Sequence, residues 1–102
     1  MADSKLAIEH DAAAQRYEVT VEGLRSLVQY DQQGNRINYL HTEVPDAIRR
    51  RGIASALARA ALDDARAAHL TVIPRCPFIS SYIARHPEYL SLVDPAYPMR
   101  PA

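Results

Sequence analysis

The spacing of apolar residues changes once along this chain, from a period of two to a period of about 3.6. Upstream of Pro45, apolar and polar residues alternate in short runs, which is typical of half-buried β-strands. Downstream of Gly52, the apolar positions fall on one stripe of a helix, at Ala54, Leu57, Ala58, Ala61, Leu62 and Ala65. The first half of the chain therefore predicts a sheet, and the second half predicts a helix that covers it.

Four strands are expected before Pro45, at Lys5–Glu9, Arg16–Glu22, Leu24–Tyr30 and Arg36–Val44. Residues 11–15 have the composition of a turn, and residues 31–35 have that of a hairpin connection. Pro45 ends the fourth strand because proline has no amide hydrogen to donate to a ladder. Short connections between successive strands favour an antiparallel meander.

After the helix, Leu70–Ile73 predicts a fifth strand and Phe78–Arg85 predicts a second helix. The order β-β-β-β-α-β-α predicts an α+β fold with a mixed, mostly antiparallel sheet of about five strands. A chain of 102 residues has room for one domain, which we expect at 1–93. Three prolines from Asp94 on predict an extended tail at 94–102.

Charge and cysteine content exclude several classes of protein. Twelve Lys and Arg residues balance twelve Asp and Glu residues, so the chain lacks the basic excess of a dedicated nucleic-acid binder. Cys76 is the only cysteine, which excludes an internal disulfide and a CxxC metal site, and the histidines lack metal-ligand spacing. No run approaches the roughly 20 apolar residues of a membrane span. We expect a cytoplasmic protein without a metal, either a monomer or a weak homodimer.

The junction between the fourth strand and the first helix carries the strongest functional signal. An arginine cluster, Arg49–Arg51, is followed by Gly52 at the start of the helix. Amides in a first helical turn have no partner within the helix, and the helix dipole adds partial positive charge, so this place suits a phosphate. Glycine would let a phosphate oxygen approach the main chain. The alternative is that Gly52 only permits a turn and the arginines form a solvated surface.

The residues from Arg49 to Ala54, Arg-Arg-Arg-Gly-Ile-Ala, resemble the (Gln/Arg)-x-x-Gly-x-(Gly/Ala) motif of the GNAT acetyltransferase superfamily. The stretches His41–Pro45, Arg51–Ala54 and His86–Tyr89 also resemble a short GNAT-like group of about this length. The resemblance implies acetyl-CoA as cofactor, with its pyrophosphate on the loop amides and its pantetheine arm in a cleft where two strands splay apart. It assigns cofactor contacts to Glu43, Val44, Arg49, Arg50, Arg51, Gly52, Ile53, Ala54 and Ser55.

Three residues are candidates for the chemistry of acetyl transfer to an amine. Tyr82 lies where relatives carry Tyr-x-x-x-Gly-Phe, which implies a proton donor to the leaving sulfur; here His-Pro replaces Gly-Phe. His41, which shares a strand face with Glu43, is a candidate base. Cys76 follows the fifth strand and could carry an acyl group. The alternatives are a buried phenol, an ordinary surface histidine and a small buried hydrophobe.

The acceptor side departs from longer members of the superfamily, which carry two helices between their first two strands, whereas this chain has only Asp11–Gln15 there. The sequence thus predicts an acetyl-CoA-dependent N-acetyltransferase with an unidentified amine acceptor, on a protein or peptide if the open acceptor side is used. Two alternatives stay open. One is a non-catalytic acyl-CoA-binding or sensing module of the same fold. The other is a small interaction protein that uses its arginine cluster.

Overall fold

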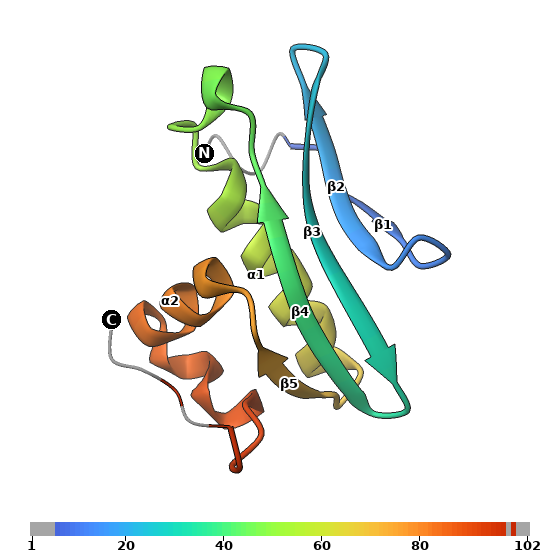
Figure 1. Ribbon diagram of the computed structural model, residues 1–102, viewed down its shortest axis with the longest axis vertical. Coiled ribbons are helices and arrows are strands. Elements are labelled where there is room, and N and C mark those ends of the chain that lie inside the picture. Colours follow the sequence, from blue (N-terminus) through green and yellow to red (C-terminus); the bar gives the residue numbers. More distant parts are fainter. Residues whose placement is uncertain (1–5, 98, 100–102) are drawn as a thin grey trace.

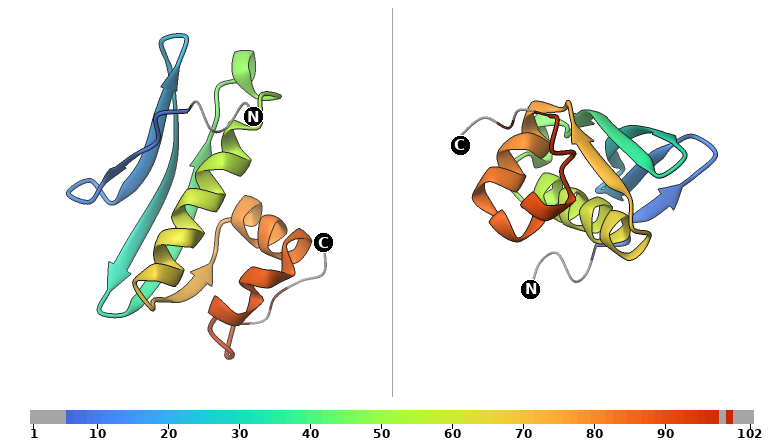
Figure 2. Two further views of the ribbon diagram at one scale, coloured as in Figure 1. Left: turned by 180° about the vertical axis from the view of Figure 1, so that it is seen from behind. Right: turned by 90° about the horizontal axis from the view of Figure 1, so that it is seen from below.

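The computed structural model describes residues 6–97 and 99 and shows a five-stranded sheet with its helices on one side (Figures 1 and 2). The strands are β1 (Glu9–Asp11), β2 (Arg16–Val21), β3 (Leu24–Gln33), β4 (Arg36–Glu43) and β5 (Thr71–Pro74). The helices are α1 (Ile53–Ala67) and α2 (Pro77–Arg85), with short 3-10 turns η2 (Asp46–Ile48) and η3 (Pro87–Leu92). The predicted α+β class and element order are confirmed.

The strands lie in the order β1-β2-β3-β4-β5, antiparallel throughout except for the parallel pair β4 and β5. The helix α1 connects the parallel pair and crosses the sheet behind β3 and β4 (Figure 1). Alanines dominate its buried face, so its backbone approaches the sheet closely. None of the helices in the described part of the chain is long and apolar enough to cross a membrane.

A layer of tyrosines joins α1 to the sheet. Tyr39 is fully buried, and its hydroxyl donates a 2.7 Å hydrogen bond to the carbonyl oxygen of Ala61 in α1. Two adjacent carboxylates of α1 accept from tyrosines of different elements. The Tyr17 hydroxyl of β2 lies 2.8 Å from Asp64 Oδ2, and the Tyr89 hydroxyl of η3 lies 2.7 Å from Asp63 Oδ1. The C-terminal half of α1 is thereby fixed to the sheet and to η3.

A bulge interrupts β4 at Leu40. On β3, the consecutive residues Gln29 and Tyr30 pair with His41 and Tyr39, so Leu40 has no partner across the ladder. Ile37 and Tyr39 face the core before the bulge. After it the alternation is reversed, because one extra residue moves every later side chain to the opposite face. Thr42 now pairs with the buried Val28 and faces inward, while His41 and Glu43 are exposed.

The parallel pairing of β4 with β5 stops just before this bulge. The last paired residues are Tyr39 and Pro74, and the amide of Cys76 then donates a 2.8 Å bond to the Tyr39 carbonyl oxygen. Beyond Tyr39, β4 continues beside β3, whereas the segment that follows β5 turns away into α2. The two strands therefore part at the end from which α1 and α2 begin, as the predicted splayed cleft requires.

Several predicted boundaries need correction. β1 occupies Glu9–Asp11 rather than Lys5–Glu9, because the tight turn at residues 12–15 sets its register with Arg16–Glu18; Lys5 itself lies outside the described residues. The hairpin connection predicted at 31–35 is only two residues long, since the polar residues up to Gln33 still pair through their backbones. The sequence did not predict η3, where Tyr89 supplies buried apolar surface.

The predicted tail begins against the edge of the sheet. Val93 forms a parallel bridge with Val72, and the Asp94 amide donates a 2.9 Å bond to the Val72 carbonyl oxygen. The Asp94 carboxylate also pairs with Arg36 at 2.6 Å, and the Tyr97 hydroxyl lies 3.3 Å from the carbonyl oxygen of Pro74. Residues 98 and 100–102 of this segment lie outside the described residues.

The tyrosine layer predicts a loss of stability in alkali. Burial, reinforced by nearby carboxylates, raises the pKa of Tyr17, Tyr30 and Tyr89, and burial raises that of Tyr39. The unfolded chain then releases its phenolic protons first, near the ordinary tyrosine pKa of about 10. Stability should be fully present below about pH 10 and should fall as the pH rises above it. Urea unfolding midpoints across this range measure the effect.

Tyr17→Phe is the matched variant, because it removes one of these phenols and keeps the ring. Its midpoint should fall less steeply between about pH 9 and about pH 11 than that of the unmodified chain. Lys5 is the sequence's only lysine, so lysine titration contributes little over this range. A midpoint that stays constant up to about pH 11 would contradict the assignment of these tyrosines as neutral in the fold.

Candidate functional site

The first turn of α1 presents backbone donors to solvent. The first bond within the helix runs from the Ala56 amide to the Gly52 carbonyl oxygen at 3.0 Å, so the amides of residues 53–55 precede the helical ladder. Upstream, η2 and the bond from the Arg51 amide to the Ile48 carbonyl oxygen, at 3.3 Å, fold the loop back on itself. The predicted anion-binding arrangement is therefore present at the start of α1.

Gly52 is the N-cap of α1 and has a φ of 74°, in the left-handed region. An L-residue is strained in this conformation, so the backbone itself requires glycine here. A Cβ placed on Gly52 would meet no atom within 4 Å, so the space beside the main chain is open. Both properties fit a phosphate that approaches the amides closely.

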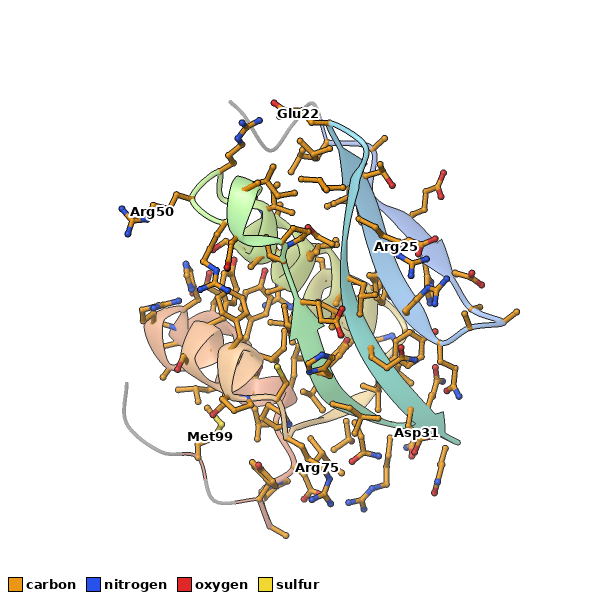
Figure 3. All side chains as sticks on the ribbon, turned by 45° about the horizontal axis from the view of Figure 1, so that its top comes forward. Glu22, Arg25, Asp31, Arg50, Arg75 and Met99 are labelled. Carbon is orange, nitrogen blue, oxygen red and sulfur yellow. The ribbon has the colours of Figure 1, made fainter. Side chains whose placement is uncertain are left out.

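The three arginines of the loop have different surroundings. Arg49 pairs with Asp46 at 2.7 Å, and Arg51 pairs with Glu22 from the turn between β2 and β3. Arg50 projects away from the body of the molecule (Figure 3) and makes no ion pair with a described residue. All three are exposed. The cluster thus supplies positive charge at the rim, and two of its members are already positioned by carboxylates.

A cleft opens beside the loop, where β4 and β5 part. We call it the β4 cleft: a cavity of about 290 Å³ lined by Thr42, Val44, Arg49, Ala54 and Phe78. The hydroxyl of Thr42 lies 3.2 Å from the Cys76 sulfur, and Cys76 is 3% exposed. Val44 and Ala54, both predicted cofactor contacts, therefore line one cleft next to the first turn of α1, and Cys76 contacts one of its lining residues.

A second cavity lies between the two helices. The α1–α2 cavity has a volume of about 330 Å³ and is lined by Arg51, Gly52, Ser55, Ala56, Arg59, Tyr82 and His86. The Tyr82 ring stacks on His86 at 4.0 Å between centroids, and the Nδ1–H of His86 can donate to the Tyr82 carbonyl oxygen at 2.8 Å. Burial raises the pKa of Tyr82, although Arg59 offsets part of this effect, so the phenol stays protonated at neutral pH.

The predicted catalytic residues do not share one cavity. Tyr82 lines the α1–α2 cavity, whereas Cys76 contacts a residue of the β4 cleft. His41 faces the other side of the sheet because of the bulge at Leu40, and its Nε2 lies 2.8 Å from Glu43 Oε2. Glu43 borders an adjoining hollow, which shares Thr42, Val44 and Arg49 with the β4 cleft. The roles of Tyr82, His41 and Cys76 stay predictions.

Two further lining residues, Arg59 and His86, were not identified as site residues from the sequence. His86 follows Tyr82 by four residues, so helical spacing could have placed the two rings on one face. Arg59 lies off the apolar stripe of α1 and is exposed, and it lines the α1–α2 cavity. Among the described residues, no group of three or more His, Cys, Asp or Glu side chains could hold a metal ion.

The left-handed conformation of Gly52 gives a direct test of this local structure. Gly52→Ala should destabilise the protein by about 1 kcal/mol, because alanine pays for the positive φ while its methyl group gains no contact. Gly52→Asn should cost less, since asparagine tolerates this region better. Thermal unfolding of the three proteins measures the order. Equal stability of all three would contradict the conformation.

Comparisons with known proteins show the family to which the chain belongs. Residues 16–92 match the family described as GCN5-related N-acetyl-transferase. The chain is 40% identical over 99 residues to protein NATD1 of Mus musculus, covering 88% of this chain and 86% of that protein. It is 32% identical to protein NATD1 of Danio rerio over 99 residues, with 88% and 86% covered.

The fold also has a solved counterpart. A protein of Staphylococcus aureus, described as GCN5-like and solved by NMR in solution, superimposes with a TM-score of 0.69 at 23% identity, covering 89% of this chain and 90% of the other. At this identity the likeness supports the fold alone. The family match over residues 16–92 and the two relatives establish that the chain belongs to the GCN5-related N-acetyltransferase family.

Proposed function

We propose that this chain is an acetyl-CoA-dependent N-acetyltransferase whose cofactor pyrophosphate binds the backbone amides at the start of α1. One observation carries the proposal. The first-turn amides of α1, which donate to no carbonyl of the helix, lie beside the β4 cleft, and Cys76 contacts a residue that lines this cleft. Acetyl-CoA would supply an acetyl group activated as a thioester. Family membership supports the reaction class, and the open space at Gly52 supports the cofactor.

Site residues are available for two parts of the cofactor, the pyrophosphate and the pantetheine arm. The amides of residues 53–55 and the exposed guanidinium groups of Arg49 and Arg51 would hold the pyrophosphate through charge-assisted hydrogen bonds. Val44, Ala54 and Phe78 give the β4 cleft apolar walls, which suit the pantetheine arm. The backbone of residues 43 and 44 lies past the point where β4 and β5 part, so β5 does not occupy it.

The acceptor amine would approach the face of the sheet opposite α1. Only a short turn joins β1 to β2, and the helices of the described chain lie on the other side (Figure 2). His41 is exposed on this face and is held by Glu43, an arrangement that suits a base taking a proton from the amine. Such an open surface fits an amine carried by a protein or peptide.

Gly52 provides a matched pair of variants to test cofactor binding by calorimetry. Asparagine and aspartate have nearly the same shape, and both tolerate the left-handed conformation better than most residues. Only aspartate adds a negative charge beside the proposed pyrophosphate. We expect saturable one-to-one binding of acetyl-CoA to the unmodified protein, weaker binding to Gly52→Asn, and a further loss of tenfold or more in Gly52→Asp, roughly the effect of one lost charge-assisted contact.

The competing functions make different predictions in the same titration. A polyanion-binding surface would bind ATP as well as acetyl-CoA, and binding would disappear with added salt. A folded protein that binds no acetyl-CoA at millimolar ligand would refute the acetyltransferase proposal. A non-catalytic binding module would bind acetyl-CoA normally and acetylate none of a panel of amines and peptides.

A second prediction concerns Cys76. We propose that its sulfur attacks the acetyl carbon, the thioester bond breaks, and the proton of Cys76 goes to the departing thiol. An amine then takes the acetyl group and regenerates the Cys76 thiol. Acetyl-CoA without an acceptor should therefore leave one acetyl group on the peptide that contains Cys76, detected by mass spectrometry after rapid denaturation. Its support is the contact between Cys76 and Thr42 beside the cleft.

Cys76→Ala is the control for this measurement, since it keeps a small apolar side chain in a buried position and removes the sulfur. It should lose the acetyl group and most of the turnover, yet keep acetyl-CoA binding. Turnover that survives in Cys76→Ala, with no acetylated Cys76 in the unmodified protein, would show direct transfer from cofactor to amine.

A further inference from the structure

We propose that Glu22 is an internal competitor for the anion site at the start of α1, and that its carboxylate holds Arg51 until a phosphate group of the ligand displaces it. This inference rests on the proposed function, because Arg51 is one of the residues assigned to the pyrophosphate. It goes further in making the hairpin between β2 and β3 a latch, which restrains the arginine loop in the free protein and releases it when the ligand binds.

The ion pair joins two parts of the chain that are distant in sequence. Glu22 lies in the turn between β2 and β3, and its Oε2 accepts a hydrogen bond from Nη1 of Arg51, 29 residues later. Figure 3 shows Glu22 at the tip of this hairpin. Arg51 directly precedes Gly52, the N-cap of α1, and lines both the α1–α2 cavity and a hollow of the arginine loop. One guanidinium group therefore contacts the hairpin and borders the proposed anion site.

The backbone at Glu22 is an independent sign that this carboxylate has a role. Val21 pairs with Leu24, so Glu22 and Gly23 form a two-residue turn, and both have a positive φ, 53° and 76° respectively. Turns of this geometry favour asparagine, aspartate or glycine at the first position. A glutamate is strained there, yet its long side chain reaches Arg51. The residue at this position therefore suits the ion pair better than it suits the turn.

Electrostatics favours opening of the pair when an anion binds. The side chains of Glu22 and Arg51 are 61% and 49% exposed, so this is a surface pair and only weakly stabilising. A pyrophosphate carries more negative charge than a carboxylate and has more acceptor oxygens, so it competes for the same guanidinium group. A carboxylate that stayed on Arg51 would also repel the phosphate oxygens beside it. Glu22 and the ligand therefore exclude each other.

The other carboxylate of the loop is placed differently. Asp46 belongs to η2 and pairs at 2.7 Å with Arg49, which is the C-cap of the same turn, so this pair lies within the loop. The pair of Glu22 with Arg51 instead connects the loop to the sheet. Its release therefore couples ligand binding to the hairpin. The coupling is reciprocal, because a ligand that weakens the ion pair is itself bound more weakly to the same extent.

Calorimetric titration of acetyl-CoA at low ionic strength tests this competition. Glu22→Gln removes the charge and keeps the length of the side chain, so it should bind acetyl-CoA about threefold tighter than the unmodified protein does, the size expected for one exposed ion pair. The gain should shrink at about 0.5 M salt, because salt screens exposed charges. Asp31→Asn is the control, since it removes a carboxylate near the opposite end of β3 (Figure 3) and should leave the affinity unchanged.

Two further variants show whether Glu22 acts through Arg51. Arg51→Gln should weaken binding, and adding Glu22→Gln to it should restore little, because the arginine that Glu22 occupies is gone. Glu22→Asn also removes the carboxylate, and asparagine suits the positive φ of this turn. It should match Glu22→Gln in affinity and unfold at no lower temperature than the unmodified protein, which separates the competition from damage to the hairpin.

The outcomes separate this inference from the proposed function. Equal affinity of the unmodified protein and Glu22→Gln for acetyl-CoA would overturn the competition and leave the acetyltransferase proposal intact. Weaker binding by Glu22→Gln would show that Glu22 positions Arg51 for the ligand, which also overturns it. The same titrations with inorganic pyrophosphate complete the test. Tighter pyrophosphate binding by Glu22→Gln in a folded protein that binds no acetyl-CoA would support the competition and refute the acetyltransferase. Binding of neither ligand would overturn both.

Discussion

The extra residue in β4 at Leu40 is the feature on which the site depends. A regular β4 would present His41 and Glu43 to the core and would keep its hydrogen-bonding edge in register with β5. The bulge instead turns Thr42 and Val44 inward, and β5 pairs no further than Tyr39 and Pro74. Backbone and side chains at the end of β4 thus border a cleft instead of a closed sheet.

The tyrosine layer makes this opening possible without loosening the fold. Below the cleft, Tyr39 ties β4 to α1, and the paired carboxylates Asp63 and Asp64 hold β2 and η3 on the same helix. The far half of α1 is therefore fixed, while its first turn projects its amides next to the cleft and the α1–α2 cavity. A single helix serves as core at one end and as binding site at the other.

The sequence predicted the fold class and the helix start because both have strong local patterns. Hydrophobic period separates the sheet from α1, and the arginines with Gly52 mark the helix start. A one-residue bulge has no such pattern in the sequence. The alternation of side chains along β4 therefore could not show that His41 would face away from Cys76. The α1–α2 cavity was missed for a related reason: Arg59 lies on α1 and His86 directly follows α2, and only packing brings them together.

The central claim is that the first turn of α1 and the splay of β4 form one cofactor site. Backbone amide chemical shifts, followed by NMR as acetyl-CoA is added, test it most directly. We expect the largest shifts at residues 52–55, together with Thr42 and Cys76 on the cleft side. Saturable binding that leaves these amides unchanged, with shifts concentrated instead on the outer face of β2 and β3, would contradict it.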